Sequence, residues 1–132
     1  MNRFMFPPAL ETFVELFNAR RYWESHEELE RPWREGGSGF YKGLILYASA
    51  FVHLQNGNAH GVQAQLTKAA RELGPYTPTY LGIDVAAVLA HASAARRVVE
   101  HEEAGWPERI DVPPLRLRRT RVRGTEAELR AG

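Results

Sequence analysis

One short segment, residues 22–34, carries the side chains best suited to chemistry. His26 and Glu30 are four residues apart, so in a helix their side chains lie one turn apart and can meet. A carboxylate beside a partly buried imidazole favours its charged form, whereas loss of water opposes that form. Such a pair could transfer protons or supply two ligands to a metal ion. We favour the alternative interpretation, a hydrogen-bonded pair that only fixes the packing of its helix.

A third ligand for a metal would have to come from another element. The order His-Glu-x-x-Glu matches the zinc-peptidase pattern His-Glu-x-x-His only in part, because the second histidine is missing. His53, near the end of an apolar helix, could supply that nitrogen if it faces residues 22–34. His26, Glu30 and His53 would then form a two-nitrogen, one-carboxylate set able to hold a divalent metal. The competing interpretation of His53 is a hydrogen-bonded histidine in or at the edge of the core.

Other side chains offer weaker candidates. Four aromatic residues could line a small-ligand pocket between helices, although aromatic residues at helical spacing more often build a core: Trp23, Trp33, Tyr41 and Tyr47. Glu27 could join a site, or belong with its acidic neighbours to a solvated face. His60 and His91 fit ordinary surface or edge positions. The sequence contains no Gly-rich phosphate loop, serine nucleophile elbow or dinucleotide fingerprint in a suitable context.

Helical periodicity supplies the scaffold that must position these residues. Apolar side chains recur at helical spacing in five segments: residues 8–18, 22–34, 40–55, 59–73 and 85 to about 100. Pro32 should kink or end the second helix, because it has no amide hydrogen and its ring crowds the preceding turn. The third segment is apolar nearly all round, which predicts a central, buried helix. The sequence thus predicts an all-α fold, a compact bundle of about five helices.

Composition narrows the class of protein. Of 132 residues, 44% are hydrophobic and 25% charged, as in an average soluble domain. The longest apolar stretch is too short to cross a bilayer. Without cysteine there is no disulfide frame, thiolate zinc site or cysteine nucleophile. The first residues lack a secretory signal pattern, so we expect a cytoplasmic protein. A homodimer is plausible, because many aromatic residues compete for a limited interior.

The chain divides into a helical-bundle domain, residues 1–106, and an extended Pro/Arg-rich arm, residues 107–132. From residue 115 onward there are six Arg and two Glu. The stretch Arg116–Arg123 is the only candidate for nucleic-acid binding, and it has no aromatic residue to stack on a base. We therefore expect an arm that is solvated or docked on the body. A docked arm could offset the acidic end of the fifth helix, at Glu100, Glu102 and Glu103.

Two blocks of sequence resemble a known family. The first reads Phe17-Asn18…Tyr22-Trp23-Glu24…His26-Glu27…Leu29-Glu30…Trp33-Arg34. The second reads Gly43-Leu44-Ile45…Ala48…Ala50…His53…Gly57-Asn58…Gly61. Together, over about residues 10–75, they resemble the bacterial and archaeal family called domain of unknown function 309. The resemblance implies a small all-α fold with its helices wound into a superhelical bundle, and it implies no settled activity.

The resemblance also marks positions of interest. The polar residues that recur in the family fall here on Glu24, His26, Glu27, Glu30, His53 and Asn58. One departure is that the family usually reads Gly-Leu-Ile-Gln where this sequence has Leu46 in place of the glutamine, which weakens any site that uses that glutamine beside His53. Two functions remain open. The first is a metal- or small-ligand-binding bundle, enzymatic or not; the second is a non-enzymatic structural or interaction module in which these groups only lock the fold.

Overall fold

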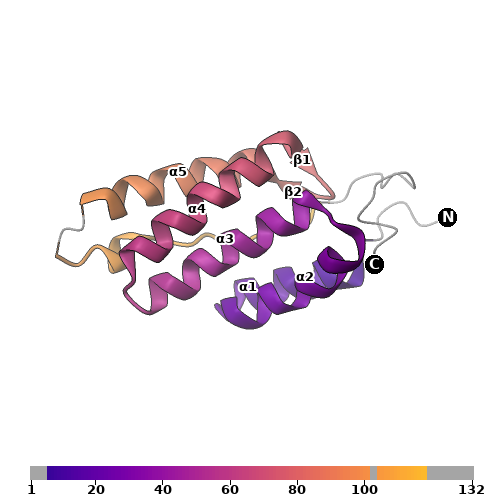
Figure 1. The fold of residues 1–132 in the computed structure, drawn as a ribbon, viewed down its shortest axis with the longest axis horizontal. Helices are drawn as coiled ribbons and strands as arrows, with labels where there is room; N and C mark the ends of the chain where they lie inside the picture. The colour runs from indigo at the N-terminus through magenta and orange to yellow at the C-terminus, as the bar shows by residue number, and fades with distance from the viewer. Residues whose placement is uncertain (1–5, 102–103, 119–132) are drawn as a thin grey trace.

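The computed structural model describes residues 6–101 and 104–118, and this part of the chain is built from α-helices. It contains two 3-10 helices, η1 (Gly74–Tyr76) and η2 (Pro107–Arg109), and a minimal antiparallel hairpin of β1 (Thr79–Tyr80) and β2 (Ile83–Asp84). The all-α class predicted from the sequence is confirmed. The helices, shown in Figure 1, are α1 (Pro8–Asn18), α2 (Tyr22–Gly36), α3 (Gly39–Gln55), α4 (Ala59–Leu73) and α5 (Val85–His101).

Local chemistry explains where these helices begin. Pro8 occupies the first turn of α1, where an amide hydrogen would have no helical partner. The side chain of Ser38 caps α3 by accepting from the Tyr41 amide at 3.0 Å. Asn58 and Asp84 cap α4 and α5 in the same way, each accepting from the amide three residues further along the chain.

The second helix runs further than expected. α2 does not end at Pro32 but continues to Gly36, with the proline inside it. The carbonyl that Pro32 leaves without a helical donor belongs to Glu28, an exposed residue, so water can satisfy it. The helix ends at Gly37, which has a φ of 70° and donates its amide to the Trp33 carbonyl at 2.6 Å.

Each helix packs on the next along the chain, and α3 occupies the centre. Figure 1 shows α3 between the α1–α2 pair and α4. Most of α3 is buried, as its nearly continuous apolar character predicted. Gly43 permits the close approach of α4, because a Cβ at this position would overlap the Leu73 side chain. Within the described residues, no helix is long and apolar enough to span a membrane.

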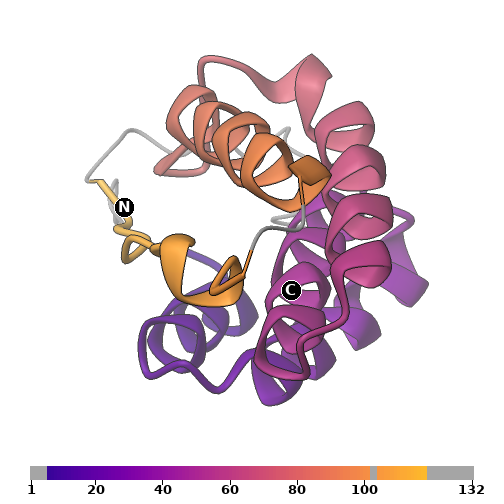
Figure 2. The same cartoon turned by 90° about the vertical axis from the view of Figure 1, so that its left-hand side faces the viewer.

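The described part of the C-terminal arm lies against the body. Figure 2 shows residues 107–118 between α5 and α1, on the open side of the helical arc. The backbone amide of Arg118 donates to Gly82 at 2.9 Å, and its guanidinium lies 3.5 Å from Asp84 at the start of α5. Arg118 therefore lies near the beginning of α5 and not at the acidic end that we expected it to offset. Residues 119–132, which include the rest of Arg116–Arg123, lie outside the described chain.

Candidate functional site

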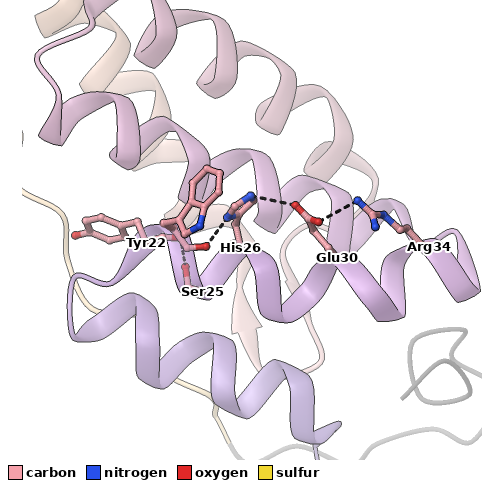
Figure 3. Close-up of polar contacts among 6 residues, drawn as sticks. Tyr22, Ser25, His26, Glu30 and Arg34 are labelled. Atoms are coloured by element: carbon pink, nitrogen blue, oxygen red, sulfur yellow. Dashed lines mark hydrogen bonds and ion pairs between the residues drawn. The ribbon is translucent and has the colours of Figure 1, made fainter.

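The His26–Glu30 pair predicted from the sequence is present, and a single helix positions it. His26 Nε2 lies 3.1 Å from Glu30 Oε1, and Arg34 Nη2 donates to Glu30 Oε2 at 3.1 Å. Figure 3 shows the three side chains in a row along α2. Because they are spaced at i, i+4 and i+8, the helix itself brings each one next to the following one.

The other ring nitrogen of His26 is also occupied. Nδ1 donates to the backbone carbonyl of Trp23 at 2.5 Å, and the indole covers the imidazole with ring centroids 4.7 Å apart. A carbonyl and a carboxylate both accept hydrogen bonds, so the ring satisfies both only with hydrogen on each nitrogen. His26 is buried, with 8% of its surface exposed, and both nitrogens have partners. This is the arrangement that burial of a polar ring requires.

These contacts decide which chemistry is available without rearrangement. A metal ligand or a general base must offer a nitrogen lone pair, and each nitrogen of His26 already faces an acceptor, the Trp23 carbonyl or the Glu30 carboxylate. Glu30 divides its two oxygens between His26 and Arg34. Proton transfer or metal binding at this pair must first displace the hydrogen between His26 and Glu30, whereas a role in fixing α2 requires no change.

The structure pairs His53 with Asn58, at the turn between α3 and α4. Asn58 Nδ2 and His53 Nδ1 are 3.3 Å apart, while Asn58 Oδ1 accepts from the Gly61 amide at 3.0 Å. The His53 ring lies directly on Gly61, where a Cβ would overlap it. Among the described residues, no three His, Asp or Glu side chains gather as metal ligands, so His26, Glu30 and His53 do not form one cluster.

The remaining candidates lie on the surface of α2. Trp23 is 57% exposed, and it is the one large hydrophobic side chain of the described residues that is exposed. Glu27 is exposed and contributes to a groove between α1 and α2, and Glu24 lies 3.9 Å from Arg21. Trp23, Glu27, Glu30 and Arg34 follow one another at i, i+4, i+7 and i+11, which places them on one flank of the helix.

A second polar cluster, built around Tyr47 and His91, was not predicted from the sequence. His91 Nε2 donates to the backbone carbonyl of Asp111 at 2.5 Å, and Nδ1 lies 2.6 Å from the Tyr47 hydroxyl. Since Nε2 carries the hydrogen, Nδ1 accepts and Tyr47 donates. Burial lowers the pKa of His91, against the opposing effect of the Asp111 carbonyl, which favours a neutral ring. Burial also raises the pKa of Tyr47 far above its usual range, so the phenol keeps its proton.

A cavity of about 190 Å³ adjoins this cluster. Its walls come from β2, the first half of α5 and residues 113–118, and Tyr47 lines it from α3. The sequence did hold a signal for His91, which follows Val88 by three residues and precedes Ala95 by four. Both neighbours are buried, so this spacing directs His91 inward. The partner segment could not be inferred, because residues 107–118 lack a helical period.

Comparison with family models gives a match over the first half of the chain. The model of a family described as "Domain of unknown function (DUF309)" matches residues 10–64, from α1 through the first turns of α4. No curated protein and no solved structure matches this chain. The matched stretch contains the His26–Glu30–Arg34 row and the His53–Asn58 turn, the two blocks on which the resemblance was based. Residues 10–64 are therefore similar to the DUF309 family, whose description assigns no activity.

Proposed function

We propose that this protein is a non-enzymatic interaction module and that a partner protein binds the flank of α2 formed by Trp23, Glu27, Glu30 and Arg34. One observation carries the proposal: an indole stands 57% exposed directly beside a polar row whose own atoms already have partners within the helix. The hydrogen bonds of the row do not involve the exposed face of the Trp23 indole. Tryptophan is among the side chains that most often dominate the binding energy of protein interfaces.

The charges on α2 indicate what kind of partner fits. The helix carries Glu24, Glu27, Glu28, Glu30 and Glu35 against only Arg31 and Arg34. Glu27 is exposed and has no ion pair among the described residues, so it can pair with a cation from outside. The partner should therefore offer an apolar recess for the indole with lysine or arginine at its rim. A second copy of this acidic flank would be repelled.

Photo-crosslinking in cells tests the proposal. A crosslinking amino acid replaces Trp23 in one variant and Arg31, on the solvent side of α2, in the control. The partner protein that the Trp23 position captures, once purified separately, should bind the wild-type chain in a 1:1 ratio. We expect Trp23→Ala to abolish this binding and Arg31→Ala to leave it nearly unchanged. Equal binding by Trp23→Ala and wild type would refute the proposal, as would cross-linking confined to a second copy of the chain.

Metal binding is the competing function that the sequence raised, and one distance supports it. His26 Nε2 and Glu30 Oε1 lie 3.1 Å apart, so a divalent ion displacing the hydrogen between them would find two ligands. Elemental analysis of protein purified without a histidine tag separates the two functions. Stoichiometric metal that His26→Ala removes would favour metal binding over the interaction module. The cytoplasmic location and the homodimer expected from the sequence stay predictions.

A further inference from the structure

The cavity beside Tyr47 and His91 has walls that the fold holds in place. On one side are Ile83 and Val88, and on the other Leu115 from the C-terminal segment. Where it lines the cavity, that segment is fixed by two hydrogen bonds between Asn18 and Leu115 and by the hydrogen bond from the Arg118 amide to Gly82. A site with fixed walls does not have to be ordered when a ligand arrives, which is a general property of small-molecule sites.

The inner end of the cavity presents a hydrogen-bond acceptor. The Asp111 carbonyl fixes the hydrogen of His91 on Nε2, so the Tyr47 hydroxyl must give its own hydrogen to Nδ1. The lone pairs of the Tyr47 oxygen are then left to accept from another group. Tyr47 is 1% exposed and its ring is held by stacking on Phe17, so this oxygen has a fixed position.

The outer end of the cavity is positively charged. Arg116 and Arg118 both line it and both are exposed. Arg118 is paired with Asp84, but Arg116 has no ion pair among the described residues. The rim therefore holds two cations and one anion, which leaves one positive charge on a guanidinium, the group best suited to holding a carboxylate through paired hydrogen bonds.

We propose that this cavity binds a small organic carboxylate that carries a hydrogen-bond donor at its opposite end. The carboxylate pairs with Arg116, the body of the ligand lies against Ile83, Val88 and Leu115, and the donor hydrogen-bonds to the Tyr47 oxygen. The volume of about 190 Å³ limits the ligand to a single small ring or a short branched chain, below the range of roughly 300–1,000 Å³ typical of larger ligands. This site is separate from the α2 flank and does not depend on the function proposed for it.

Calorimetric titration of the full chain with 4-hydroxybenzoate and with benzoate tests both ends of the site. We expect saturable 1:1 binding of both probes, with 4-hydroxybenzoate the tighter. Arg116→Gln should weaken both by about tenfold, since it removes a charge-assisted hydrogen bond. Arg71→Gln, which removes an exposed arginine of α4 that does not line the cavity, should change neither.

The Tyr47→Phe variant tests the inner end separately. It should lower the affinity for 4-hydroxybenzoate to that for benzoate and leave benzoate binding unchanged, so benzoate binding also reports that the variant is folded. The proposal is overturned if neither probe binds saturably, if Arg116→Gln binds as wild type does, or if the wild-type protein does not distinguish the two probes.

Discussion

Asn18 holds the backbone of Leu115 with both ends of its side-chain amide. Nδ2 donates to the Leu115 carbonyl at 2.8 Å, and Oδ1 accepts from the Leu115 amide at 2.8 Å. The two residues are 97 positions apart, one at the end of α1 and the other in the C-terminal segment. The contact imitates the paired hydrogen bonds of a β-ladder, and it joins the first helix to residues that lie against the last (Figure 2).

Replacing Asn18 by Ala should loosen the C-terminal segment from α1. Both backbone groups of Leu115 lose their protein partner, and Leu115 itself is a buried part of the core. We expect a loss of about 1–3 kcal/mol in the free energy of unfolding, measured by urea denaturation. Asn56→Ala, at an exposed position after α3, is the matched control and should cost much less. Equal stability of the two variants would show that the Leu115 contact contributes nothing.

Substitutions in the row formed by His26, Glu30 and Arg34 should lower the free energy of unfolding by unequal amounts. His26→Ala removes the second hydrogen bond to the Trp23 carbonyl and leaves one Glu30 oxygen without its donor, for an expected cost of about 1–3 kcal/mol. Arg34→Ala removes only an exposed ion pair within the helix, for about 0.3–0.5 kcal/mol. Denaturation curves of the two variants check this order. If His26→Ala is no more costly than Arg34→Ala, the row does not fix α2.

The helices and their caps could be predicted from the sequence because they depend on local rules. The stripe of Leu10, Phe13, Val14 and Phe17 is buried in α1 as its spacing required. Asn58 and Asp84 cap the helices that follow them. The sequence predicted a second helix over residues 22–34 with a kink or an end near Pro32, whereas α2 continues to Gly36. The cost of the proline depends on whether the carbonyl of Glu28 meets water or protein, which is a property of the tertiary fold.

The site could be predicted only where it lies within one helix. His26 and Glu30 meet because their spacing alone brings them together. Whether His53 would join them depended on the direction in which the end of α3 faces. That direction is set by the turn to α4, where Gly61 makes room for the His53 ring. The Tyr47–His91 contact depends on the packing of α3 near α5 and on a segment without periodicity, so no local pattern could indicate it.

The half-buried His91 should make stability depend on pH. Its pKa lies below the usual 6.5 in the folded protein because burial disfavours the charged ring, so the unfolded chain takes up the proton first. Above the pKa of His91 in the unfolded chain, about 6.5, its contribution to the free energy of unfolding does not change with pH. Below that pH, the free energy of unfolding falls as the unfolded chain takes up the proton. Urea denaturation at pH 7.5 and pH 5.5 should show a smaller pH difference for His91→Gln than for wild type. His60→Gln, an exposed histidine of α4, should keep the wild-type difference.

The contact between His53 and Gly61 gives a prediction whose sign changes with the background. In the wild-type chain, Gly61→Ala places a Cβ inside the His53 ring, and displacing the ring should cost about 1–3 kcal/mol. In a His53→Ala background that obstacle is gone. The same substitution should then stabilise α4, by up to about 1 kcal/mol, because alanine favours a helix over glycine. A double-mutant cycle by urea denaturation measures the difference. Additive effects would mean that the His53 ring does not require a glycine at position 61, and the close fit of this turn would then contribute nothing to stability.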